Sequence, residues 1–238
     1  MASIEGHTSR AYDDALSSLH TRVVEMGGLV LLQVREAANA YTDWDGAAAQ
    51  RVLEREHEVN AYDAKVEQAA FALIARRQPM ATDLRAIISL SKTVAELERA
   101  GDESNKIALT MLGRAGRAGA RPGAATVSDA RHLARLAVVM MRMALEALDQ
   151  LDVNLALEVV RRDQELDAEY AAGLRRLLSR AMEDPRQFTM AVEAAFVLKS
   201  FERIGDHARN LARIVEAMVG DSTLTRVRSL HSEPAAKS

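Results

Sequence analysis

The chain has 238 residues, of which 48% are hydrophobic, only 4% are aromatic and none is cysteine. Without cysteine there are no disulfides, thiolate metal sites or cysteine nucleophiles, so any metal ion has to be held by carboxylate, amide or imidazole groups. The formal net charge of −3 argues against a protein held to nucleic acid by a basic surface. No uncharged stretch approaches the roughly 20 residues that cross a bilayer, and the first thirty residues show no signal peptide. We therefore expect a cytoplasmic protein that does not insert into the membrane.

The composition predicts an all-α protein. Alanine, arginine, leucine, glutamate and methionine, which are strong helix formers, dominate the chain, whereas β-branched and aromatic runs are scarce. Turn signals occur in a few places, and we place six helices between them, at about 9–42, 46–77, 80–113, 128–151, 154–183 and 185–219. Capping residues support several of these helices, namely Asp45, Ser128, and Asp184 with Pro185.

The turns between the predicted helices are short except at one place, which divides the chain into two units. Short turns favour antiparallel neighbours. Residues 114–127 are rich in glycine, arginine and small side chains, and are therefore predicted to be a linker. It separates a first three-helix bundle at 9–113 from a second at 128–219, and the polar segment 220–238 is expected to be a disordered tail.

The two units carry an internal repeat. Glu98-Arg-Ala-Gly-Asp102, in the third predicted helix, recurs 104 residues later as Glu202-Arg-Ile-Gly-Asp206 in the sixth. The second helix of each unit also aligns, so that the segment from Glu56 to Asn60 corresponds to Asp163-Gln-Glu-Leu-Asp167. The repeat therefore predicts two related bundles, each with acidic residues on two of its helices.

The spacing within these motifs places the acidic side chains on one helix face. Residues four apart lie only about 40° apart around the helix axis. The same face of the sixth helix carries Leu198, Ala195 and Ala191, so the acidic residues continue an apolar stripe and are predicted to point inward. The glycines of the motifs, Gly101 and Gly205, lower helix stability relative to alanine and are predicted to permit close approach by another helix or another chain.

Like charges on a buried face repel one another and need compensation. Arginine or lysine side chains from a neighbouring helix are one source of compensation. The other is a cation between the helices, for which carboxylate ligands select Mg²⁺, Mn²⁺, iron, Ca²⁺ or, less readily, zinc. Both alternatives stay open at this point.

The repeated motif resembles the paired signature of the PhoU family, the phosphate-uptake regulators. The resemblance includes Glu98-Arg-Ala-Gly-Asp102, the segment from Leu198 to Ala212, and the upstream segment from Pro79 to Arg85, and it extends over about residues 9–219. It implies a pair of three-helix bundles, usually dimeric, that acts in the cytoplasm as a negative regulator of the phosphate-starvation response. Such a protein links a phosphate ABC transporter, through its ATPase subunit, to a phosphate-sensing histidine kinase at the inner face of the membrane.

The resemblance also implies iron, zinc or another divalent metal at the acidic motifs, and no organic cofactor. The candidate metal ligands map to Glu56, Glu98 and Asp102 in the first half, and to Asp163, Asp167, Glu202, Asp206 and Asn210 in the second. The first half departs from the pattern, since Asn60 stands where an acid is expected and Lys106 stands at the position of Asn210. Because Lys106 is able to neutralise the first acidic pair, we expect the second half to bind metal better.

Two other function classes compete with this interpretation. Ferritin-like di-iron enzymes need Glu-x-x-His on each of two helices, whereas Glu54-Arg-Glu-His57 is the one match in the sequence. His207 lies about 100° around the helix from Asp206 and is predicted to be a rim residue rather than a ligand. We therefore expect no enzyme. The second alternative, a metal-free helical adaptor whose acidic repeats pair with arginines, shares the fold and differs only at the site.

Overall fold

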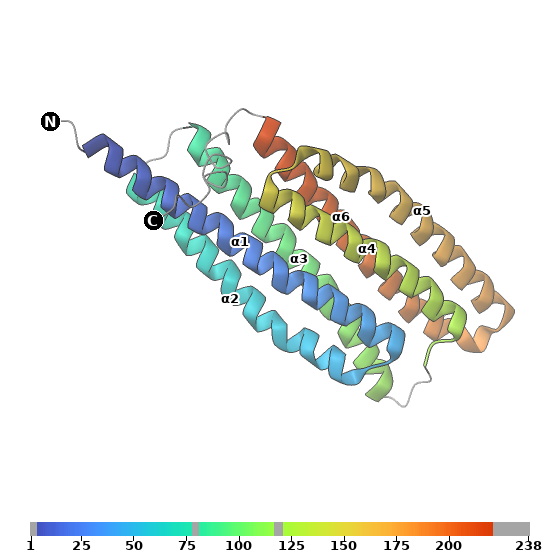
Figure 1. Ribbon diagram of the computed structural model, residues 1–238. Helices are drawn as coiled ribbons and strands as arrows, with labels where there is room; N and C mark the ends of the chain where they lie inside the picture. Colours follow the sequence, from blue (N-terminus) through green and yellow to red (C-terminus); the bar gives the residue numbers. More distant parts are fainter. Residues whose placement is uncertain (1–3, 78–80, 117–120, 221–238) are drawn as a thin grey trace, which may run out of the picture.

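The computed structural model describes residues 4–77, 81–116 and 121–220, and these ranges are entirely helices and short turns (Figure 1). The α-helices are α1 (Ile4–Asp43), α2 (Gly46–Arg77), α3 (Ala81–Gly116), α4 (Ala124–Gln150), α5 (Val153–Glu183) and α6 (Phe188–Gly220), and a short 3₁₀-helix (Pro185–Gln187) precedes α6. The predicted all-α class is therefore confirmed. Within the described ranges, no helix combines the length and the apolar character that a bilayer span requires.

The helices form two three-helix bundles that lie side by side. Helices α1, α2 and α3 pack against one another, as do α4, α5 and α6 (Figure 1). The bundles meet through α1 against α4 and α3 against α6, whereas α2 and α5 lie on the outside. The predicted pair of tandem three-helix bundles is confirmed, and their apolar side chains join into one continuous core.

Several predicted helix ends are confirmed and one cap is wrong. Helix α2 has the predicted bounds, and Asp45 caps it through Oδ1, which accepts hydrogen bonds from the Ala47 and Ala48 amides at 2.9 and 3.1 Å. Ser128 does not cap α4, because α4 begins at Ala124 and its N-cap is Gly123, which forms no side-chain hydrogen bond. Thr126 and Val127 of this first turn are buried, which stabilises the turn in place of a cap.

The predicted linker 114–127 is helical at both ends, since α3 continues to Gly116 and α4 begins at Ala124. The 3₁₀-helix after Asp184 also moves the start of α6 from the predicted 185 to Phe188. Pro79 of the upstream family element, residues 117–120 and nearly all of the predicted tail, 221–238, lie outside the described residues.

The first hairpin of each bundle has the same construction. Helices α1 and α4 are each followed by a residue with positive φ, Trp44 at 61° and Leu151 at 52°, and then directly by an aspartate that caps the next helix. Asp152 Oδ1 accepts hydrogen bonds from the Asn154 and Leu155 amides at 2.8 and 3.2 Å, as Asp45 does in the first bundle. The left-handed residue reverses the chain and the aspartate satisfies the first free amides of the following helix.

Candidate acidic sites and the seam between the repeats

Helices α2 and α3 carry the acidic motifs of the first repeat, and α5 and α6 carry those of the second. Asp163 and Glu202 are buried, with exposed fractions of 7% and 8%, so their predicted inward orientation is confirmed. Asp167 is exposed, and the prediction that it points inward is wrong, because α5 is an outer helix and only one side of it faces the bundle. The remaining predicted acidic ligands are half-buried: Glu56, Glu98, Asp102 and Asp206.

Basic side chains neutralise much of the acidic cluster in the second repeat. Arg209 donates to Asp163 Oδ2 at 2.5 Å and lies 2.8 Å from Asp206 Oδ1. Lys199 Nζ lies 2.6 Å from the Glu202 carboxylate. Burial and the neighbouring charges of Asp206 and Asp167 nevertheless raise the pKa of Glu202 above its usual value. Arginine and lysine compensation, the first alternative drawn from the sequence, is therefore present in this repeat.

One oxygen of this cluster has no partner among the described residues. Asp163 Oδ1 is buried and accepts no hydrogen bond, although Oδ2 of the same carboxylate is paired with Arg209. Partial loss of contact with water and the charges of Asp163 and Asp206 raise the pKa of the nearby Asp167. Buried carboxylate oxygens normally accept hydrogen bonds, so the free oxygen is a donor atom available to a ligand.

The acidic residues of the first repeat are less compensated. Glu56 Oε2 accepts a hydrogen bond from Gln33 Nε2 at 3.0 Å. Among the described residues, no Lys, Arg or His forms an ion pair with Glu56, Glu98 or Asp102. Burial raises the pKa of Glu98, and the charges of Asp102 and Glu56 raise it further. Burial and the charge of Glu56 likewise raise the pKa of Asp102.

The role predicted for Lys106 differs in the structure. Its Nζ lies 2.8 Å from Glu103 Oε1, so its ion pair is with Glu103 rather than with the acidic pair of the motif. Its charge lowers the pKa of Asp102, but burial and the Glu56 charge outweigh that effect. The expectation that the first repeat is the neutralised one is therefore reversed, because Arg209 and Lys199 supply more compensation to the second repeat.

The motif glycines permit close helix approach, as predicted. A Cβ atom on Gly205 of α6 would lie 2.0 Å from Leu166 Cδ2 of α5. A Cβ atom on Gly101 of α3 would lie 3.0 Å from Gln33 Oε1 of α1. The Gly205 contact brings α6 close to the acidic helix α5, whereas the Gly101 contact brings α3 close to α1, whose Gln33 binds Glu56 of α2.

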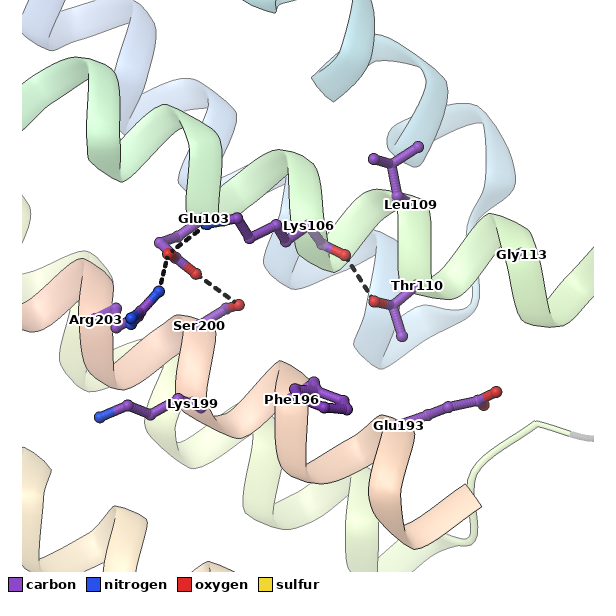
Figure 2. Close-up of a pocket in the computed structure, with 10 residues that line it drawn as sticks. All are labelled: Glu103, Lys106, Leu109, Thr110, Gly113, Glu193, Phe196, Lys199, Ser200 and Arg203. Carbon is purple, nitrogen blue, oxygen red and sulfur yellow. Dashed lines mark hydrogen bonds and ion pairs between the residues drawn. The ribbon is translucent and has the colours of Figure 1, made fainter. Parts of the chain in front are cut away.

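A second polar cluster, not predicted from the sequence, joins the repeats along α3 and α6; we call it the seam. Glu103 of α3 accepts hydrogen bonds at 2.9 Å from both Ser200 and Arg203 of α6 (Figure 2). Glu96 of α3 lies 2.9 Å from His207 Nδ1. Burial alone would raise the pKa of Glu103, but hydrogen bonds from Lys106, Ser200 and Arg203 outweigh it and lower that pKa.

The seam includes one side chain that was predicted to be a metal ligand and arginines for which the sequence predicted no partner. Asn210, predicted to join the metal ligands, donates from Nδ2 to Glu96 at 2.9 Å. Arg203 pairs across the helices with Glu103, whereas Arg99 pairs with Glu96 on its own helix. The 104-residue repeat relates the two main contacts of the seam. Glu96 corresponds to Ser200 and Glu103 to His207, so the contact of Glu103 with Ser200 and that of Glu96 with His207 occupy equivalent positions.

The acidic side chains are suitable ligands for a divalent cation, but within the described residues they are not preorganised to bind one. Both repeats offer carboxylate oxygens, the ligands that hard divalent cations prefer. Among residues 4–77, 81–116 and 121–220, however, no group of three or more acidic or imidazole side chains is arranged to hold a metal ion. His57 and Glu54, the single di-iron-like pair in the sequence, are exposed on α2.

These features define a class of protein, a duplicated helical bundle in which each repeat carries a Glu-Arg-x-Gly-Asp motif on its third helix. The family model described as the PhoU domain matches residues 23–111 and again residues 130–215. The chain belongs to the PhoU family, and the resemblance drawn from its motifs is confirmed.

Individual relatives match most of the chain. The phosphate-specific transport system accessory protein PhoU homolog of Pseudomonas aeruginosa is 38% identical over 217 residues, which is 91% of this chain and 88% of the relative. The phosphate-specific transport system accessory protein PhoU of Escherichia coli is 34% identical over 88% of this chain and 85% of its own length. The crystal structure of PhoU from Pseudomonas aeruginosa superposes with a TM-score of 0.82, at 38% identity, over 88% of this chain and 99% of that one.

Proposed function

We propose that this chain is an accessory regulator of a phosphate transport system and restrains the phosphate-starvation response when phosphate is plentiful. The observation that carries the proposal is the likeness, over both repeats, to proteins named phosphate-specific transport system accessory proteins. We infer that it works as a homodimer in the cytoplasm, held at the inner face of the membrane by its partners. Those partners are the ATPase subunit of a phosphate ABC transporter and a phosphate-sensing histidine kinase. The proposal gives the chain no catalytic role.

Deletion of the gene in the organism that encodes it tests this function. In high phosphate, the deletion strain should express its phosphate-starvation genes constitutively, and a plasmid copy should restore repression. A reporter fused to a phosphate-starvation promoter measures both effects. Unchanged reporter output in high phosphate would contradict the proposal.

We further propose that the acidic motifs bind a divalent cation, with the first repeat as the stronger site. Burial and mutual repulsion raise the pKa values of Glu98 and Asp102, and no basic side chain among the described residues pairs with them. A cation would relieve this repulsion, and Glu56 adds a third carboxylate. In the second repeat, Arg209 already forms ion pairs with Asp163 and Asp206 and would compete with the cation for these carboxylates. The carboxylates have to move toward one another, because no group of three is preformed among the described residues.

The ion pairs of Arg209 and Lys199 favour a second candidate. This is a metal-free adaptor in which basic side chains of the protein itself neutralise the acidic motifs. Metal analysis of untagged protein, purified without chelators, separates the two. Cation binding predicts bound metal that falls in Asp102→Asn more than in Asp206→Asn, with Asp149→Asn, at an exposed position of α4, as the unchanged control. Protein without stoichiometric metal, together with thermal stability that added metal leaves unchanged, would support the adaptor instead.

A further inference from the structure

A buried glutamine of α1 lies beside the acidic residues of the first repeat. Gln33 is fully buried, and its amide group contacts residues of both α2 and α3. Its Nε2 atom lies 3.3 Å from the Val52 carbonyl oxygen, 3.0 Å from Glu56 Oε2 and 3.1 Å from Asn105 Oδ1. One side chain of α1 therefore reaches both helices that carry the acidic motif of this repeat.

These contacts fix the orientation of the Gln33 amide. A carbonyl oxygen accepts hydrogen bonds and cannot donate them, and the same is true of an ionised carboxylate, so the NH₂ end of the amide has to face Val52 and Glu56. The other end of the amide, Oε1, is buried and has no hydrogen-bond partner among the described residues. Because buried side-chain oxygens normally have a partner, this oxygen is a second free donor atom for a ligand.

The motif glycine leaves space in front of this oxygen. A Cβ atom on Gly101 would lie 3.0 Å from Gln33 Oε1 and 3.7 Å from Glu56 Oε2, so both oxygens border the space that a side chain at position 101 would enter. Asp102 follows on α3, and its pKa is raised by burial and by the charge of Glu56, which places these two carboxylates near each other. All three helices of the first repeat therefore offer oxygen atoms in one region.

The second repeat presents a different atom at the equivalent place. A Cβ atom on Gly205, the counterpart of Gly101, would lie 3.6 Å from Met140 Sδ of α4. A thioether is a soft ligand, whereas amide and carboxylate oxygens are hard ligands that suit Mg²⁺, Ca²⁺ and Mn²⁺. The two repeats therefore differ in the ligand atom that their first helices present to the acidic motifs.

We propose that Gln33 is a further ligand in the first repeat and makes its site selective for a hard divalent cation over Zn²⁺, which prefers nitrogen and sulfur ligands. Oε1 adds a neutral oxygen to the carboxylates of Glu56, Glu98 and Asp102. The carboxylates have to move to bind a cation, whereas Oε1 is already held in position by the hydrogen bonds of Nε2. The inference rests on the cation binding proposed above for the acidic motifs.

Titration of the full-length, untagged protein with Mn²⁺ and with Zn²⁺, after removal of bound metal by a chelator, tests the proposal. Gln33→Met introduces the side chain that the second repeat has at this place, and Gln50→Met, at an exposed position of α2, is the matched control. Electron paramagnetic resonance of free Mn²⁺, with Zn²⁺ as competitor, gives the dissociation constants of the tighter site. Gln33→Met should weaken Mn²⁺ binding about tenfold and Zn²⁺ binding much less, and Gln50→Met should change neither.

Gln33→Glu separates a ligand from a purely structural glutamine. It keeps an oxygen at this position but loses the Nε2 donor, so it should bind Mn²⁺ more tightly than Gln33→Met does if the oxygen is a ligand. Equal binding by the two variants would overturn the proposal, because the Nε2 hydrogen bonds would then account for the whole effect. If Gln33→Met does not fold, Gln33→Glu decides alone, and loss of its Mn²⁺ binding with Zn²⁺ binding retained would overturn the proposal.

The remaining outcomes separate this inference from the proposals on which it rests. Unchanged Mn²⁺ binding in Gln33→Met, or equal weakening of Mn²⁺ and Zn²⁺ binding, would refute the Gln33 ligand and leave the cation site standing. Wild-type protein that binds neither ion would refute the cation site and the Gln33 ligand together. The deletion experiment is independent of both results, because it measures phosphate regulation rather than metal binding.

Discussion

Replacement of Gly205 by alanine tests whether the motif glycine lets α5 and α6 pack closely. In an open helical position, alanine is favoured over glycine by about 0.8–1.0 kcal/mol. At Gly205, however, the new methyl group would lie 2.0 Å from Leu166 Cδ2, and Leu166 is fully buried. Leucine has to change its rotamer inside a filled core, and such overpacking costs about 1–3 kcal/mol. We therefore expect a net loss of about 1 kcal/mol.

Gly28 of α1 provides the matched control. It is an exposed helical glycine, and a Cβ atom placed on it meets no other atom within 4 Å. Gly28→Ala should therefore stabilise the protein by the full helix-propensity difference, about 0.8–1.0 kcal/mol. The two variants should differ by about 2 kcal/mol, which corresponds to roughly 4–8 °C in melting temperature for a chain of this size.

Urea unfolding monitored by circular dichroism measures these differences, provided that the m-value is unchanged. Leu166→Ala removes the clashing methyl group, so in that background Gly205→Ala should become stabilising, like Gly28→Ala. If Gly205→Ala stabilised the wild-type protein as much as Gly28→Ala does, the close approach of α5 to α6 would be refuted.

Three further substitutions test other contacts by urea unfolding. Arg209→Ala leaves the buried Asp163 carboxylate without its ion pair, so stability should fall by about 3 kcal/mol, and a change below about 0.5 kcal/mol would show that the pair contributes nothing. Leu151→Gly relieves about 1 kcal/mol of left-handed strain but loses a buried side chain, so we expect a net loss of about 2 kcal/mol; a gain would refute this balance. Glu103 has a lowered pKa in the folded protein, so its contribution is present above its unfolded pKa and is lost as the pH falls. Glu103→Gln should therefore be less stable than wild type at pH 7, and the difference should shrink below about pH 5; a difference independent of pH would contradict the assignment.

The sequence was sufficient for the features that depend on local spacing. Turn signals and caps such as Asp45 located the helix ends to within a few residues, and the repeated motif identified two related bundles. The inward orientation of Asp163 and Glu202 followed from the apolar residues on the same helix face. Gly101 and Gly205 were also interpretable, because glycine inside a helix costs stability unless a neighbour needs the space.

The sequence was insufficient where a side chain has two possible partners and a neighbouring helix decides between them. Lys106 is one turn from Asp102, but it pairs with Glu103, which the position of α6 makes part of a buried network. Glu103 lies about 140° around the helix from Glu98, so the motif did not predict that Glu103 belongs to a functional cluster. The signal that was available is that α3 carries buried residues on more than one face, which is typical of a helix with neighbours on two sides.

The lengths of the two repeats show where this architecture tolerates change during evolution. Glu56 and Asp163 are 107 residues apart, whereas Glu98 and Glu202 are 104 apart, so the second repeat is three residues shorter between its two acidic motifs. Three residues removed from within a helix would rotate everything beyond them by about 60° and carry the acids off their shared face. A deletion at the turn end of a helix leaves that phase intact, and α6 indeed begins 14 residues before Glu202, whereas α3 begins 17 residues before Glu98. Insertions and deletions in relatives should therefore gather in the turns between the second and third helices.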